Sequence, residues 1–358
     1  MKKLEAYGFT PGFKTEATCY SEFIPGRIIS HYRDLYKVVT DQGEFFATLA
    51  GKFRHKAKHL LEFPAVGDFV MVDRSNDENG NGIIHHVLKR KSSFERTAVG
   101  FKNEVQIVAA NIDIVFICMS LNNDYNLSRL ERYLSVAWNS GAIPVVVLTK
   151  ADLCEDVMQK QAEIRSIAIG TDIVTTSNQD TSSIDRLLPY IKEGSTAAFI
   201  GSSGVGKSTL INCLAGQEIL STKEIRQDDK GRHASTRREL ILLSEGGVLI
   251  DTPGMRELGV DSVDLAQSFS DIEVLASQCR FKDCAHKKEP GCAVRGAIED
   301  GSLNPRRLEN YLKLKKEARY EGLSSRQIES EKFNEMFAEV GGMKKARKIM
   351  KEKNKRKY

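Results

Sequence analysis

Five short segments rich in β-branched and aromatic residues lie between residues 22 and 95, each bounded by polar turn sequences. This composition, interrupted by Gln-Gly and Asn-Gly turns, indicates short paired strands. We predict strands at Arg27–Ser30, Tyr36–Thr40, Phe45–Leu49, Asp68–Val72 and Ile83–Val87. Five strands in so short a stretch are typical of a small closed barrel. The oligonucleotide-binding (OB) fold is the most common such barrel, and an SH3-like barrel is the alternative.

The pattern changes near residue 110. Ile112–Ser120 is an almost continuous apolar run, as expected for a strand buried on both faces of a parallel sheet. Apolar residues then recur at helical spacing from Leu127 to Trp138, and a second helix is predicted at Lys207–Ala215. Further buried strands are predicted at Pro144–Thr149, Asp172–Thr176, Ala197–Ile200 and Val248–Asp251. This alternation predicts an α/β domain with a parallel sheet, an architecture typical of nucleotide-binding proteins.

Beyond Asp261 the chain is polar and is predicted to be helical, with a cluster of cysteines as an interruption. One set of apolar residues offers a helical face that could pack against the rest of the protein: Leu308, Leu312, Ile328, Phe333, Met336, Phe337 and Val340. With 358 residues, two or three domains are expected.

Composition places the chain among soluble globular proteins, with 41% hydrophobic and 28% charged residues. No apolar run approaches the roughly 20 residues of a membrane helix. The first ten residues lack the apolar core of a secretory signal. Seven cysteines, three of them close together, favour a metal site in a reducing compartment over a disulfide framework. We therefore expect a cytoplasmic protein.

The net charge of +5 is unevenly distributed. Residues 341–358 contain nine Lys or Arg and one Glu, which predicts a basic tail that contacts a polyanion such as nucleic acid. A solvated terminus without a partner is the alternative. Lys52–His59 holds four basic side chains and two histidines, and is either a second phosphate-contacting segment or a solvated loop.

The strongest motif lies between the strand predicted at 197–200 and the helix predicted at 207–215, and matches G-x-x-x-x-G-K-[ST], the phosphate-binding P-loop. Its glycines let main-chain N–H groups turn around phosphate oxygens, and the helix N-terminus adds partial positive charge. We expect Lys207 to reach the outer phosphates and Ser208 to bind Mg²⁺. The expected nucleotide-binding residues here are Gly201, Ser202, Ser203, Gly204, Val205, Gly206, Lys207, Ser208 and Thr209.

A second motif favours guanine over adenine nucleotides. It follows a predicted buried strand, resembles the N/T-K-x-D element of GTPases, and consists of Thr149, Lys150, Ala151 and Asp152. The Asp152 carboxylate can accept hydrogen bonds from the N1 and N2 donors of guanine, a pair that adenine lacks. The aliphatic part of Lys150 would lie over the base, and Thr149 replaces the more common Asn. Ser177 and Asn178 match the base-supporting S-A element only loosely.

Asp251 and Gly254 belong to an Asp-Thr-Pro-Gly sequence after another predicted strand, which fits the D-x-x-G element. Asp251 would hold Mg²⁺ through water, and the Gly254 N–H would contact the γ-phosphate. A plain turn is the alternative. In the polar segment 231–236, Thr236 is the candidate hydroxyl ligand to Mg²⁺, with Ser235 as the alternative.

The order of these elements is unusual. An ordinary GTPase begins with the P-loop. Here the guanine-reading motif at 149–152 and the base-supporting segment at 177–178 precede the P-loop at 201–208. The segment 231–236 and the D-x-x-G element at 251–254 follow it. This order is a circular permutation. The same sheet can form because packing depends on which strands are adjacent in space more than on their order in the chain.

Three cysteines and one histidine lie within 14 residues: Cys279, Cys284, His286 and Cys292. A Cys₃His set suits a tetrahedral structural zinc ion, which would fold a subdomain too small to hold a core alone. Three unrelated buried cysteines are the alternative.

The segments GSSGVGKSTL, GRHAST, DTPG and CRFKDCAHKKEPGC resemble the ribosome small subunit-dependent GTPase A family, and the resemblance covers nearly the whole chain. It implies a multidomain α/β protein with an N-terminal OB-fold barrel, a circularly permuted P-loop GTPase domain and a C-terminal helical zinc-binding domain. The expected parts are an RNA-binding OB domain at 1–97, the GTPase domain at 98–262, the zinc domain at 263–340 and the basic tail at 341–358.

The resemblance further implies GTP hydrolysis stimulated by the small (30S) ribosomal subunit, contact with its rRNA and assistance in late maturation of that subunit. The implied cofactors are Mg²⁺ with GTP and one structural Zn²⁺. We expect a monomer without membrane contacts.

One catalytic position departs from the usual GTPase pattern. Many GTPases carry a Gln after D-x-x-G that orients the attacking water, and Met255 stands there instead. We therefore expect slow intrinsic hydrolysis and propose His233 as the water-positioning residue, with an RNA contact or simple exposure as its alternatives. Two other functions are possible from sequence: a nucleotide-gated rRNA-binding factor with incidental hydrolysis, or a P-loop ATPase or kinase. Asp152 and the permuted order argue against the latter.

Overall fold

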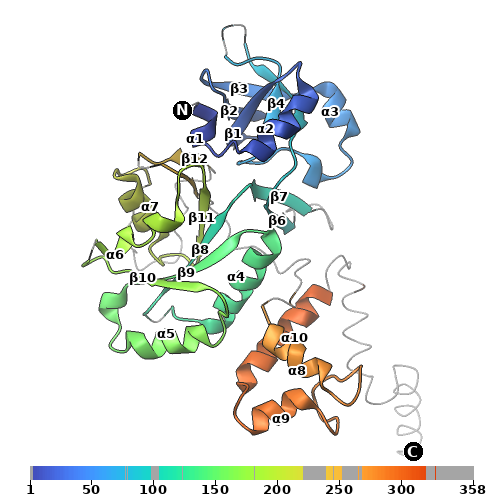
Figure 1. Ribbon diagram of the computed structural model, residues 1–358, viewed down its shortest axis with the longest axis vertical. Helices are drawn as coiled ribbons and strands as arrows, with labels where there is room; N and C mark the ends of the chain where they lie inside the picture. Colours follow the sequence, from blue (N-terminus) through green and yellow to red (C-terminus); the bar gives the residue numbers. More distant parts are fainter. Residues whose placement is uncertain are drawn as a thin grey trace, which may run out of the picture.

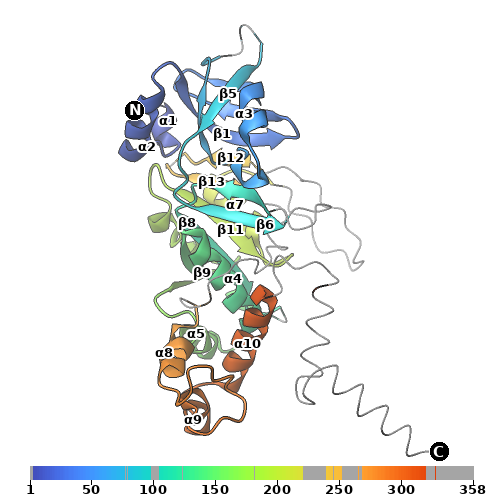
Figure 2. The same cartoon turned by 90° about the vertical axis from the view of Figure 1, so that its right-hand side faces the viewer.

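The computed structural model describes residues 3–76, 78, 80–97, 105–122, 124–180, 182–220, 239–244, 246–251, 265, 268–319 and 327. A barrel lies at one end of the elongated molecule, an α/β lobe in the middle and a helical lobe at the other end (Figures 1 and 2). The basic tail at 341–358, and the apolar positions from Ile328 to Val340, lie outside the described residues. None of the described helices combines the length and apolar character that crossing a bilayer requires.

The barrel confirms the five strands expected from the sequence. They are β1 (Ile24–Tyr32), β2 (Leu35–Val39), β3 (Glu44–Leu49), β4 (Phe69–Val72) and β5 (Gly82–Val87). β1, β2 and β3 pair antiparallel in turn, β3 pairs parallel with β5, and β4 joins β5 back to β1. This closed Greek-key order is that of an OB-fold rather than an SH3-like barrel. Its interior holds Ile28, Val38, Phe45, Val70 and Ile84.

Three short helices accompany the barrel: α1 (Lys3–Ala6), α2 (Pro11–Ala17) and α3 (Gly51–Lys56). α3 contains the first part of the basic segment 52–59. The side chains of Lys52, Arg54, His55 and Lys56 are exposed on it.

A hairpin that the sequence pattern did not indicate connects the barrel to the α/β lobe. Its strands are β6 (Ser93–Thr97) and β7 (Val105–Ala110). The guanidinium of Arg27, which is only 1% exposed, donates hydrogen bonds to the carbonyl oxygens of Gly67 (3.1 Å) and Asn111 (3.2 Å) and to that of Tyr7. These contacts attach barrel strand β1 to the residue after β7. The expected domain boundary at residue 97 coincides with the end of β6 and stays a prediction.

The α/β lobe has the sheet order β10-β9-β8-β11-β13-β12. Its strands are β8 (Ile114–Ser120), β9 (Ile143–Thr149), β10 (Asp172–Thr175), β11 (Thr196–Gly201), β12 (Glu239–Leu242) and β13 (Val248–Asp251). Its helices are α4 (Leu127–Ser140), α5 (Val157–Arg165), α6 (Ser182–Asp185) and α7 (Lys207–Ala215). All neighbouring strands are parallel except β12, which is antiparallel to β13. The strand that leads into the P-loop, β11, is therefore central, although it comes fourth in this part of the chain.

The C-terminal lobe contains the helices α8 (Ser270–Ser277), α9 (Ala293–Glu299) and α10 (Pro305–Arg319). They lie in the region beyond Asp261 that the sequence predicted to be helical. Helix α10 of this lobe lies beside α4 (Figure 2). The two helices are joined by a buried ionic network. Arg307 of α10 lies 2.9 Å from Glu131 of α4 and 2.6 Å from Asp271 of α8, and the amide of Asn310 also donates to Glu131. Because burying a charge is costly unless it is paired, this network fixes how the lobe sits on α4.

Candidate functional site

The P-loop connects β11 to α7 through backbone conformations that favour glycine. Gly201, Gly204 and Gly206 have φ angles of 147°, 72° and 104°. A Cβ atom at Gly201 would lie 2.5 Å from the carbonyl oxygen of Cys118 on the neighbouring strand. The glycine spacing of the motif is therefore required by the local geometry, as expected of a phosphate-binding loop.

Lys207, the first residue of α7, lies across the start of this loop. Its ammonium donates hydrogen bonds to the carbonyl oxygens of Gly201 (2.8 Å) and Ser202 (2.6 Å). The positive charge is thus held beside the loop and at the N-terminus of α7, where main-chain N–H groups and the helix dipole favour an anion.

The guanine-reading motif lies against the P-loop. The Thr149 hydroxyl donates to the carbonyl of Val205 (2.6 Å), and the Lys150 ammonium donates to that of Gly204 (2.8 Å). Thr149 is 4% exposed, so its hydroxyl supplies a buried hydrogen bond at the position where Asn is more common. The structure therefore brings together two motifs that are separated by some fifty residues in the chain.

Asp152 is held by the segment that sequence matched only loosely to a base-supporting element. The Ser177 hydroxyl donates to the Asp152 carboxylate (2.7 Å), and the Ser177 N–H donates to the hydroxyl of Ser183 (2.9 Å). Asn178 follows and is exposed. Lys150 has a φ of 56°, a left-handed conformation that is uncommon outside glycine and is often found at functional sites.

One residue beside the P-loop was missed from the sequence. The carboxylate of Asp124, in the loop between β8 and α4, accepts a hydrogen bond from the Ser202 hydroxyl. It also lies 2.8 Å from the guanidinium of Arg129 on α4. A single Asp in a polar loop carries no motif, so no signal in the sequence could have identified it.

The remaining predicted site residues are less fully described. The main chain of Asp251 ends β13, which pairs with β11, so this residue lies at the same sheet edge as the P-loop. Outside the described residues lie the side chain of Asp251 and the whole of His233, Ser235, Thr236, Gly254 and Met255.

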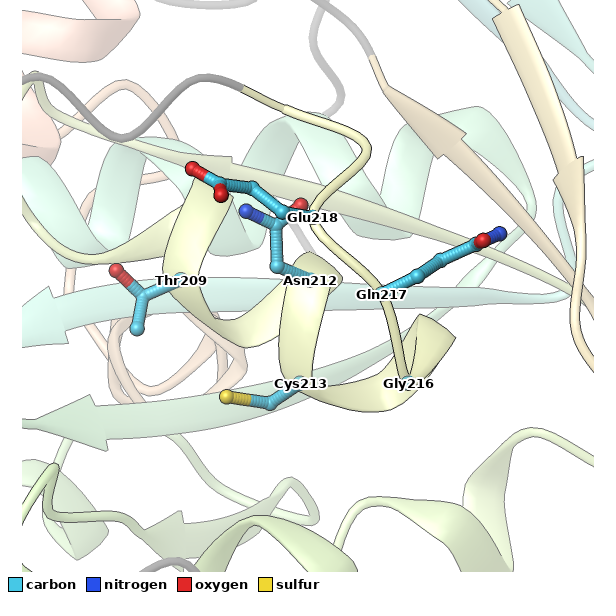
Figure 3. Close-up of a pocket in the computed structure, with 6 residues that line it drawn as sticks. All are labelled: Thr209, Asn212, Cys213, Gly216, Gln217 and Glu218. Atoms are coloured by element: carbon cyan, nitrogen blue, oxygen red, sulfur yellow. The ribbon is translucent and has the colours of Figure 1, made fainter.

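Thr209, at the start of α7, lines an open surface pocket of about 360 Å³ along that helix (Figure 3). The other lining residues are Asn212, Cys213, Gly216, Gln217 and Glu218. The Asn212 side chain hydrogen-bonds to the main chain of Ile219 and Leu220, which holds the turn after α7 in place.

The cysteine cluster forms a compact set of ligand atoms in the C-terminal lobe. Cys279, Cys284, His286 and Cys292 place one ligand atom each within 4.8 Å of one another. The Nδ1 atom of His286 lies 3.7 Å from the Cys279 sulfur and 3.5 Å from the Cys292 sulfur, and these two sulfurs are 3.9 Å apart. With Zn–S and Zn–N distances of about 2.3 and 2.0 Å, tetrahedral ligands lie about 3.5–3.8 Å apart. The cluster therefore fits a metal ion of this size.

Glu289 shapes the loop that carries these ligands. Its carboxylate accepts hydrogen bonds from the N–H groups of Ala285 (3.0 Å), Lys287 (2.8 Å) and Lys288 (2.9 Å). The main-chain N–H of Glu289 itself, together with these three bonds, lowers the pKa of Glu289 to about 2. The three donors come from residues on either side of His286, whose φ is 58°. The acidic residue thus supports the strained turn at the histidine ligand.

Comparisons with known proteins agree with this site. The RsgA GTPase profile matches residues 87–261. A profile of the ABC transporter family matches residues 184–354, a span that contains the P-loop but begins after Asp152. The chain is 48% identical to the small ribosomal subunit biogenesis GTPase RsgA 2 of Lactiplantibacillus plantarum, over 95% of this chain and 96% of the relative. It is 46% identical to the small ribosomal subunit biogenesis GTPase RsgA 1 of Listeria innocua, over 88% and 90%.

Two solved structures share the fold. YjeQ from Thermotoga maritima superposes with a TM-score of 0.62 at 30% identity, covering 82% of this chain and 98% of that chain. YloQ, described as a circularly permuted GTPase, superposes with a TM-score of 0.58 at 26% identity, covering 83% and 95%. The permuted order inferred from the motifs is therefore confirmed by the strand order and by these neighbours.

Proposed function

Because this chain belongs to the RsgA GTPase family, we propose that it hydrolyses GTP when bound to the small ribosomal subunit and assists late maturation of that subunit. The single observation that carries the proposal is the contact of Thr149 and Lys150 with the P-loop carbonyls. It supports a shared pocket in which Asp152 reads guanine while the P-loop holds the phosphates.

The proposed binding roles follow from the chemistry of each group. Main-chain N–H groups of Ser203 to Thr209 surround the phosphates, and Lys207 neutralises their charge. The Ser208 and Thr236 hydroxyls hold Mg²⁺, which lowers the cost of charge on the γ-phosphate in the transition state.

The proposed catalytic roles involve the segments after the P-loop. Asp251 orients the Mg²⁺ shell through water, and the Gly254 N–H contacts the γ-phosphate. His233 positions the attacking water, since Met255 cannot. We propose that the subunit speeds hydrolysis by completing this catalytic site.

The metal of the C-terminal lobe is proposed to be zinc, held by Cys279, Cys284, His286 and Cys292. Four protein ligands leave no open position for substrate, so the ion is structural. It would keep the ligand loop folded and thereby hold α8 and α9 together.

The partner surfaces are proposed to be the two outer lobes and the basic tail, all contacting rRNA. Exposed basic side chains on α3 support a phosphate contact by the barrel domain at 1–97. The GTPase domain at 98–262 and the zinc domain at 263–340 complete the proposed organisation. We propose that the protein acts as a monomer in the cytoplasm, where ribosomal subunits mature.

Hydrolysis of GTP, ATP, CTP and UTP, each with and without purified small subunits, tests the proposal. We expect turnover of GTP only, and faster turnover when subunits are present. Equal use of ATP would contradict the role of Asp152. GTP turnover that subunits leave unchanged would instead favour a nucleotide-gated rRNA-binding factor.

A further inference from the structure

Two polar groups of Ser202 are held by side chains, one outside the P-loop and one at its end. Its hydroxyl donates to the Asp124 carboxylate, and its carbonyl accepts a hydrogen bond of 2.6 Å from the Lys207 ammonium. Ser202 is the second residue of the P-loop, so its orientation sets the direction of the peptide groups that follow. Those peptide groups carry the N–H donors expected to surround the phosphates.

Asp124 is itself held firmly. Its carboxylate lies 2.8 Å from the Arg129 guanidinium, which also donates to the Asp124 main-chain carbonyl. The N–H of Asp124 donates to the side-chain oxygen of Asn122 (3.0 Å), and Arg129 belongs to the first turn of α4. The carboxylate is therefore fixed between α4 and the P-loop, and Arg129 balances its charge beside a site built for an anion.

From these contacts we infer that Asp124 is a positioning residue for nucleotide binding: through Ser202 it holds the P-loop in the phosphate-binding conformation. This inference rests on the proposed function, because it concerns the same site. Its physical basis is pre-organisation. A loop that is already ordered loses less conformational entropy when the phosphates bind.

The inference predicts a specific pattern of nucleotide affinities. Asp124→Ala should raise the Kd for both GDP and GTP about three- to tenfold, the range expected for loss of one hydrogen bond. Ser202→Ala should have a similar effect. The double variant should bind no more weakly than the weaker single variant, since both changes remove the same contact. Asp124→Asn keeps an acceptor oxygen and should bind more tightly than Asp124→Ala.

Two controls separate positioning from general damage. Asp156→Ala removes a carboxylate that accepts from the Gln159 N–H (2.8 Å) and caps α5, so it should leave nucleotide affinity unchanged. The preference of Asp124→Ala for guanine over adenine nucleotides should match that of the unmodified protein, because Asp152 reads the base.

Titration of fluorescent GDP and GTP analogues into the full-length protein and each variant, together with thermal unfolding, provides the test. Failure of the unmodified protein to bind either nucleotide would contradict the proposed function itself. If the unmodified protein binds, the positioning role is overturned when Asp124→Ala retains full affinity, or when the effects of Asp124→Ala and Ser202→Ala simply add. Non-additive losses of affinity, with rescue by Asn, support it.

Discussion

The Thr149 hydroxyl donates a hydrogen bond of 2.6 Å to the carbonyl of Val205, across 56 residues of chain. The sheet explains how these residues meet. β8 pairs with both β9 and β11, with Ser120 opposite Thr149 and Cys118 opposite Gly201. All three strands are parallel, so their carboxyl ends form one edge, on which both motifs lie. A permuted chain therefore builds the same site as an unpermuted one.

Replacing Thr149 tests this contact directly. Thr149→Val keeps the shape of the side chain but leaves the Val205 carbonyl without its donor, which costs about 1–3 kcal/mol when the acceptor is buried. We expect nucleotide affinity to fall about five- to tenfold, a change of about 1 kcal/mol in binding. Thr149→Ser keeps the hydroxyl and should retain most of the affinity. Equal nucleotide affinity in the Val and Ser variants, measured by calorimetry, would show that the hydroxyl plays no part.

Asp152→Asn should change which base is accepted. The variant loses the carboxylate that accepts from guanine N1 and N2, and a hydrogen bond to a charged group contributes about 1.5–3 kcal/mol. GTP affinity should therefore fall at least tenfold. Xanthine carries a carbonyl oxygen where guanine carries the N2 amine, and the Asn amide can donate to it. We expect tighter binding of xanthosine triphosphate than of GTP, and the reverse preference in competition titrations would contradict the assigned role.

Much of the fold follows from the hydrophobic pattern, because strands buried on both faces produce long apolar runs. The barrel strands and the parallel strands were predicted to within a few residues. The β6–β7 hairpin was not predicted, because the mostly apolar segment Val105–Ala110 runs almost directly into Ile112 and resembles one continuous apolar segment. A single turn-forming residue, Asn111, with a φ of 56°, lies between β7 and β8, and one such residue is too weak a signal to divide the apolar run.

The candidate site, like the fold, could be predicted only in part from the sequence. The P-loop, the guanine-reading motif and the metal ligands have fixed spacings, because each motif acts through neighbouring backbone or side-chain groups. Asp124 and Glu131 each contact a residue far away in the chain, Ser202 and Arg307 respectively. Neither residue belongs to a sequence motif, and Glu131 resembles an ordinary polar residue on a helix. Only the packed structure reveals such contacts.

Removal of the proposed zinc ion should unfold part of the C-terminal lobe. Without zinc, the ligand loop has few buried apolar groups to keep it folded. The free energy of zinc binding therefore acts as the free energy of folding of this loop. Cys284→Ser should reduce the zinc content from about one ion per chain to near zero. It should also make residues 279–292 sensitive to limited proteolysis. Cys213→Ser, which changes an exposed cysteine on α7, should leave both properties unchanged. A variant at Cys284 with full zinc content would remove this residue from the ligand set.

The docking of the C-terminal lobe on α4 should depend on pH once Arg307 is replaced. Burial raises the pKa of Glu131, and Arg307 opposes that shift. Arg307→Met leaves the Glu131 charge buried without its cation, which costs about 3–5 kcal/mol of stability. A carboxyl whose pKa is higher in the folded state than in the unfolded state takes up a proton on folding. The loss of folding stability is therefore largest above the folded-state pKa and becomes smaller as the pH falls.

Urea unfolding of Arg307→Met and of the unmodified protein at about pH 8 and about pH 5 measures this dependence. The difference in stability between the two proteins should be smaller at the lower pH. Arg132→Met is the matched control, because it breaks an ion pair with Glu317 in which both side chains are more than one-third exposed. Such a pair contributes less than about 1 kcal/mol, and its loss should show no comparable pH dependence. An Arg307→Met penalty as small as that of the control would mean that the buried network does not hold the lobe on α4.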